Sequence, residues 1–77
     1  MAFANNLLQS ALNEIAHLHS GEVFIVRDLF KGYEWNRIPI GERLLLGTLF
    51  LNEANQKGSK VVAVQKTTSG QQKYRVL

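Results

Sequence analysis

The sequence predicts a single small α+β domain in which helices and one short strand precede a C-terminal β-hairpin. Three observations predict this fold class. Apolar residues recur at helical spacing over residues 3–18 and again over residues 41–56. Residues 60–67 and 71–77 are rich in β-branched and aromatic side chains, and a turn-forming segment separates them. The chain has 77 residues, so residues 1–77 are expected to form one domain around one core.

The first half begins with an amphipathic helix and continues with a strand. Apolar side chains from Phe3 to Leu18 fall within one half of a helical wheel, and Asn and Gln side chains occupy much of the other half. Gly21 supplies a C-terminal stop just beyond the last turn. The run from Glu22 to Val26 is too short for a helix of its own and favours a strand.

The middle of the chain is punctuated by Gly and Pro. Asp28 is expected to cap a short helix that Gly32 interrupts, and residues 33–36 then form an irregular or one-turn link. Pro39 suits the entry to the helix over residues 41–56. Because apolar side chains surround most of the circumference of that helix, we expect it to be the most buried element.

The C-terminal segment predicts two strands joined by a turn at residues 68–70. On the second strand Lys73 and Arg75 share one face, while Tyr74 and Val76 share the other. The first short strand would pair beside this hairpin as a third strand. The order helix, strand, helix, helix, strand, strand is the connectivity of a winged helix, that is, a helix-turn-helix core with a β-hairpin wing at about residues 60–77.

Charge is distributed unevenly along the chain. Residues 1–56 hold four Lys or Arg against six Asp or Glu, a net charge of −2, whereas residues 57–77 hold five cations and no acid, a net charge of +5. Such an asymmetry indicates a polyanionic partner for the basic segment. The alternative is that its lysines protect exposed strands from aggregation.

The sequence lacks the residues that several classes of function require. There is no cysteine, and His17 and His19 lie only two positions apart, so they would not share a helix face as metal ligands. The segment from Gly41 to Gly47 lacks the lysine and hydroxyl of a phosphate-binding loop. We therefore expect no enzyme, no metal and no cofactor. With no apolar run of about 18 residues and no secretory signal, we expect a cytoplasmic protein without a membrane partner.

Nucleic-acid binding is better supported by the residues. The helix over residues 41–56 suits duplex reading poorly, because it carries Glu42 and Glu53 but only Arg43 as a cation, although its Asn and Gln side chains could read adenine. The hairpin is the stronger candidate, since its cations could follow a phosphate backbone and the Tyr74 ring could stack on a base. The other interpretation of Tyr74 is packing of the wing against the core. The predicted binding residues of this segment are Lys57, Lys60, Lys66, Lys73, Tyr74 and Arg75.

A second basic and aromatic cluster surrounds Gly32. Lys31 and Arg37 are its predicted binding residues, and Tyr33 and Trp35 are its rings. The alternative for this cluster is a core tryptophan with Arg37 paired to a nearby glutamate, Glu34.

The stretch from Val23 to Phe50 resembles a known family. Its pattern is Asp-Leu-Phe, then Gly, then Trp, followed by Gly-x-Arg-x-x-Leu-Gly-x-x-Phe, at Asp28, Leu29, Phe30, Gly32, Trp35, Gly41, Arg43, Leu46, Gly47 and Phe50. It is similar to a family of small winged-helix single-stranded DNA-binding proteins encoded on staphylococcal cassette chromosome elements. The resemblance implies a winged-helix fold that binds single strands without an oligonucleotide-binding barrel. It does not imply which residues make the contacts, because the shared residues are mostly glycines and apolar groups.

The leading hypothesis from the sequence is a single-stranded DNA-binding protein with little sequence preference. By the resemblance, it would serve replication or transfer of a mobile genetic element, whose replication proteins would be partners. The alternatives are a duplex-binding transcriptional regulator and a protein-interaction adaptor. The sequence leaves the oligomeric state open.

Overall fold

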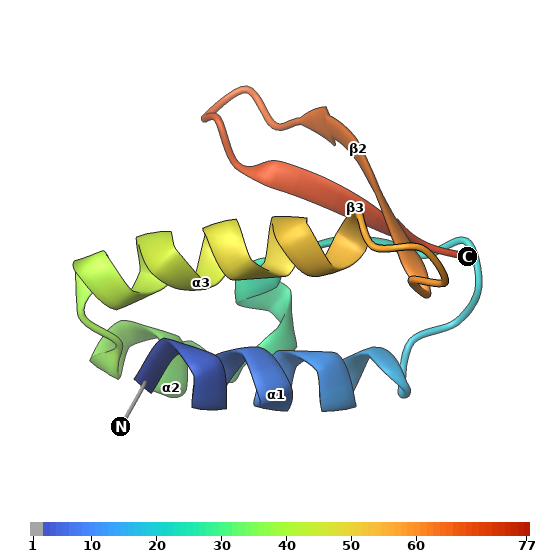
Figure 1. Ribbon diagram of the computed structural model, residues 1–77. Helices are drawn as coiled ribbons and strands as arrows, with labels where there is room; N and C mark the ends of the chain where they lie inside the picture. The colour runs from blue at the N-terminus through green and yellow to red at the C-terminus, as the bar shows by residue number, and fades with distance from the viewer. Residues whose placement is uncertain (1–2) are drawn as a thin grey trace.

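The computed structural model describes residues 3–77, and residues 1 and 2 and the side chain of Phe3 lie outside the described part of the chain. A layer of helices packs against a three-stranded antiparallel sheet (Figure 1). The elements in chain order are α1 (Phe3–Ile15), β1 (Val23–Ile25), the 3-10 helix η1 (Val26–Leu29), α2 (Gly32–Arg37), α3 (Ile40–Ala54), β2 (Val61–Lys66) and β3 (Gln72–Val76). None of the helices formed by the described residues has the length and apolar character needed to cross a membrane.

The sheet has the order β1-β3-β2, so the short first strand does join the hairpin as a third strand. Phe24 of β1 lies opposite Tyr74 of β3, and Ala63 of β2 lies opposite Tyr74 on the other side. Tyr74 and Val76 are buried and Arg75 is exposed, which confirms the predicted alternation of faces along β3. The sheet therefore turns one face to the helices.

Three aromatic rings join the sheet to the helices at the centre of the core. The ring of Phe50 on α3 lies 6.0 Å from that of Phe24 and 4.8 Å from that of Tyr74, both edge to face, and Phe24 and Tyr74 stack at 5.7 Å. All three side chains are buried. Desolvation by this burial raises the pKa of Tyr74 to about 12, so its hydroxyl stays neutral throughout the physiological range.

The expectation that α3 is the most buried element is wrong for its N-terminal half. Leu46, Phe50 and Ala54 are buried, but Ile40 and Leu44 are among the most exposed large apolar side chains of the described residues. The main neighbours of α3 are α1 and the sheet (Figure 1), which cover one side of it, and α2 meets it at a corner through Arg43. An all-round apolar pattern thus leaves leucines in solvent when the fold has too few elements to cover them.

The expected role of Asp28 as the residue that begins a helix is also wrong. The 3-10 helix η1 begins two residues earlier, at Val26. The Asp28 carboxylate instead reaches back to accept a hydrogen bond from the backbone N–H of Ile25 at 3.0 Å. Glu34 does the same for the N–H of Lys31 at 3.1 Å, where α2 starts. Each acid satisfies a backbone donor that a helix start would otherwise leave free.

Candidate nucleic-acid interface

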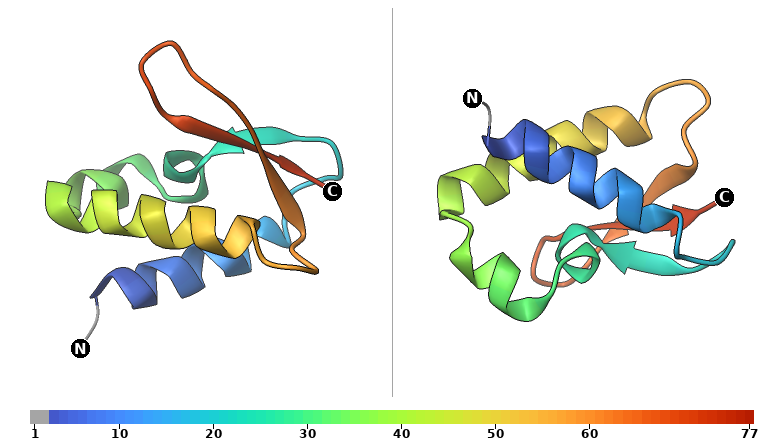
Figure 2. Two further views of the ribbon diagram at one scale, coloured as in Figure 1. Left: turned by 45° about the horizontal axis from the view of Figure 1, so that its top comes forward. Right: turned by 90° about the horizontal axis from the view of Figure 1, so that it is seen from below.

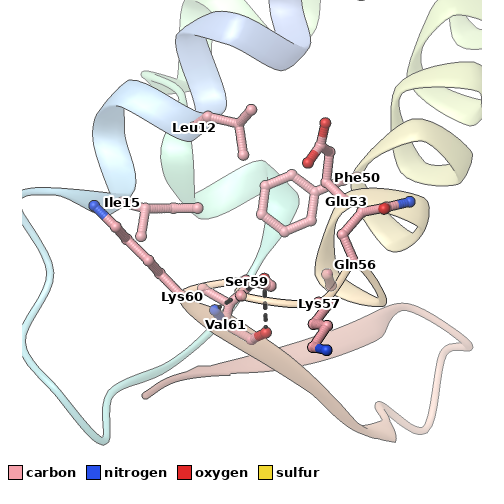
Figure 3. Close-up of a pocket in the computed structure, with 11 residues that line it drawn as sticks. Leu12, Ile15, Phe50, Glu53, Gln56, Lys57, Ser59, Lys60 and Val61 are labelled. Carbon is pink, nitrogen blue, oxygen red and sulfur yellow. Dashed lines mark hydrogen bonds between the residues drawn. The ribbon is translucent and has the colours of Figure 1, made fainter.

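Two of the predicted binding residues, Lys57 and Lys60, lie at the base of the hairpin. They belong to the turn between α3 and β2 and line a cavity of about 300 Å³ beside the last turns of α1 and α3. Their side chains extend to opposite sides of that turn (Figure 3). Phe50 contributes to the cavity wall but is fully buried, so the cavity offers no open ring to a base. These lysines can neutralise phosphates but do not form a pocket for a base.

A β-bulge decides which way Lys66 points. The register of pairing between β2 and β3 shifts between Ala63 and Lys66, so that Lys66 lies opposite Gln72. Without the extra residue in β2, Lys66 would lie opposite Gln71 and share a face with Lys73 and Arg75. The bulge instead places it on the side of the hairpin that carries Tyr74 further along the strand, which is the side toward the helices.

Lys73 and Arg75 lie on the opposite, outer face of the sheet. Arg75 is opposite Val23 of β1 on one side and opposite Val62 of β2 on the other, and Lys73 is opposite Ile25. Their neighbours on this face are aliphatic. The five cations of residues 57–77 thus do not form one track, because the structure divides them among the base, the inner side and the outer side of the hairpin.

Tyr74 does not provide a stacking surface, and its prediction as a binding residue is wrong. Its side chain is 1% exposed and packs between Phe24 and Phe50. The structure agrees with the other interpretation, in which the Tyr74 ring packs the wing against the core. Its register opposite Phe24 places it above the helices, where no single strand can reach the ring.

An exposed ring is found instead on α2. The Tyr33 side chain is 54% exposed. The Arg37 guanidinium lies 5.1 Å from the centre of this ring, and the Lys31 ammonium lies 5.9 Å from it. Tyr33 and Arg37 meet because residues four apart share a helix face. An exposed aromatic side chain between two cations can stack on a base while the cations neutralise the flanking phosphates.

The neighbouring Trp35 has a structural role. It is partly buried, its ring lies 5.8 Å from that of Phe30, and the Arg43 guanidinium lies 5.4 Å from its centre. Arg43 also donates hydrogen bonds to the carbonyl oxygens of Ile38 at 2.9 Å and Asn36 at 3.3 Å. The one cation of α3 is therefore engaged in holding the corner between α2 and α3. The alternative of a core tryptophan with Arg37 paired to Glu34 is not observed, because Trp35 is only partly buried, Arg37 lies on Tyr33 and Glu34 caps α2.

The structure brings part of the predicted set together. Lys31 and Arg37 meet on the Tyr33 ring. In Figure 1 the hairpin rises above α3 while α2 lies below it, although the hairpin tip and α2 project close together in the view from below (Figure 2, right). Lys66 of the hairpin and the cluster of Lys31, Tyr33 and Arg37 on α2 are therefore two separate candidate patches. Tyr33 is not among the binding residues predicted from the sequence, although its spacing of four from Arg37 is a signal that could identify it.

Comparison with known proteins gives one match. A family model described as a domain of unknown function, DUF1413, matches residues 9–75. No curated protein and no solved structure gives a significant match. The matched range includes α2, α3 and nearly all of the hairpin, and thus all of the candidate interface.

Proposed function

The chain belongs to the DUF1413 family, a domain of unknown function, and we propose that it binds single-stranded DNA with little sequence preference. The observation that carries this proposal is the exposed Tyr33 ring with Arg37 and Lys31 beside it. Non-specific single-strand binding requires cations along the backbone and aromatic rings for the bases, and this cluster supplies both. Following the resemblance in its sequence, we place this activity in replication or transfer of a mobile genetic element.

In this proposal the fold is a winged helix, with the hairpin β2–β3 as the wing. The order of elements and the antiparallel sheet β1-β3-β2 support it. The strand stacks on the Tyr33 cluster of α2 and continues to the wing, where Lys66 neutralises a further phosphate. The helix that reads duplex DNA in many helix-turn-helix proteins is α3, and its solvent face from Ile40 to Asn55 offers no cation. That neutral face favours a single strand over a duplex as the ligand.

A competition titration tests the proposed ligand. A fluorescently labelled mixed-sequence oligonucleotide is displaced by unlabelled single strand or by the matching duplex at several salt concentrations. The single strand should compete at much lower concentration than the duplex, and a permuted sequence should compete equally. The logarithm of the affinity should fall with the logarithm of salt with a slope of about −0.7 per phosphate contact. Preference for one duplex sequence, or binding that is insensitive to salt, would overturn the proposal.

Two charge reversals of equal size test the path of the strand. Lys66→Glu changes the inner side of the wing, and Arg75→Glu changes the outer face of the sheet by the same amount. We expect Lys66→Glu to weaken binding by about tenfold and to reduce the magnitude of the salt slope by about 0.7, whereas Arg75→Glu should have a much smaller effect. Anisotropy titrations over a salt series measure both quantities. A larger effect of Arg75→Glu would move the strand to the outer face.

A further inference from the structure

The solvent side of α3 carries a cluster of large apolar side chains at its N-terminal end. Ile40 is 73% exposed, Leu44 is 70% exposed and Leu45 is 46% exposed. Ile40 and Leu44 are one turn apart on the same helix face, and Leu45 follows about 100° further around the helix. Exposed apolar side chains gathered in this way, rather than scattered singly, mark an interaction surface on a small domain.

The rest of this face is electrically neutral. It continues along α3 through Thr48, Asn52 and Asn55, all of which are exposed. At 100° per residue, Glu42 and Glu53 lie on the side of the helix opposite Ile40 and Leu44, although Glu42 borders the cluster at Leu45, three residues after it. Arg43 is directed into the corner between α2 and α3 by its hydrogen bond to the Ile38 carbonyl. A partner that docks here therefore gains no attraction from charge, and a charged partner has no counter-ion.

A second copy of the same chain meets these requirements. The chain carries a net charge of +3, so two copies repel each other wherever their cations face. The solvent face of α3 is a surface on which two copies can approach without opposing like charges. A polyanion would find no cation on it. An anionic lipid surface would find none of the lysines and arginines that line the polar side of membrane-surface helices.

The shape of this α3 face also allows it to pack against the same face of a second copy. Leu44 lies at the middle of the cluster, with Ile40 one turn before it and Thr48 one turn after it. In a two-fold contact between antiparallel helices, Leu44 meets Leu44 of the second copy and Ile40 meets Thr48. The small side chain of Thr48 and the bare backbone of Gly41, beside which the structure places nothing within 4 Å, leave room for the facing leucines.

We propose that the solvent face of α3 is the dimer interface of this protein, with Leu44 at the two-fold axis. The interface consists of one face of a 15-residue helix. It therefore belongs to the small, weak class of protein contacts, and we expect a dissociation constant on the order of ten micromolar. This inference does not depend on the proposed function, because neither its surface nor its test involves nucleic acid.

Paired charge variants test this interface. Leu44→Glu and Leu44→Lys each place two like charges at the axis, so each variant alone should be monomeric in sedimentation equilibrium at concentrations where the wild type dimerises. An equimolar mixture of the two should associate again, because opposite charges then meet across the axis. Leu77→Glu and Leu77→Lys are the matched controls, since Leu77 is 62% exposed and lies outside α3. These controls should dimerise like the wild type, alone and mixed.

Three results would overturn the inference. The first is a wild type that stays monomeric up to millimolar concentration. The second is a pair of Leu44 variants that dimerise as the wild type does. The third is a Leu44→Glu and Leu44→Lys mixture that fails to associate while circular dichroism shows both variants folded. Because Leu44 is exposed, neither substitution removes a core contact, and loss of folding is not expected.

Discussion

Replacing Tyr33 by alanine should weaken binding of single-stranded DNA roughly tenfold or more. Stacking of one base on an aromatic side chain contributes about 1–3 kcal/mol, and about 1.4 kcal/mol corresponds to a factor of ten in affinity. The ring is more than half exposed and stands beside two cations, so it is the one place on α2 where a base and its phosphates can be bound together. Fluorescence anisotropy with a short labelled oligonucleotide measures the loss.

The salt dependence distinguishes stacking from charge in this prediction. Tyr33→Ala removes no charge, so its affinity should be lower at every salt concentration while the slope stays that of the wild type. Arg37→Gln should reduce both the affinity and the slope. Tyr33→Phe is the matched control, because it keeps the ring and should retain most of the affinity. Equal affinity of Tyr33→Ala and the wild type would remove α2 from the interface.

Much of the fold can be predicted from local patterns in the sequence. The alternation of Lys73, Tyr74, Arg75 and Val76 predicts which side of β3 is buried, because a strand has a period of two and only one face meets the helices. The apolar spacing from residue 3 onward predicts α1, although the helix ends at Ile15 and residues 16–17 continue as a turn. These features depend on neighbours in the sequence, so they can be read without the tertiary structure.

The candidate site could be predicted only in part, because tertiary packing decides it. Tyr33 and Tyr74 both have basic neighbours, and nothing in their local sequence says that Tyr74 is buried against Phe24 and Phe50 while Tyr33 is exposed. The side on which Lys66 lies depends on one extra residue in the pairing of β2 with β3. The run Val61-Val-Ala-Val64 gives no sign of that bulge, since its side chains suit either face of a sheet.

Phe50→Ala should cause the largest loss of stability among the substitutions considered. Removing a fully buried phenylalanine costs about 3–5 kcal/mol, and a small domain has a total of only about 5–15 kcal/mol. Phe50 is 0% exposed and its ring contacts both Phe24 and Tyr74, so it links α3 to two strands of the sheet. Urea denaturation followed by circular dichroism measures the change. Phe50→Leu is the control, and it should lose less because it keeps most of the apolar contact.

The same variant separates a role in the fold from a role in binding. If Phe50 acts only through the core, single-stranded DNA still binds the folded fraction of Phe50→Ala with the affinity of the wild type. Oligonucleotide at 100 times its dissociation constant should then stabilise wild type and variant alike, by about 2.7 kcal/mol. A smaller gain for Phe50→Ala would mean that the cavity next to Lys57 and Lys60 takes part in binding. An equal gain would mean that Phe50 acts only through the fold, by holding the sheet and its wing against α3.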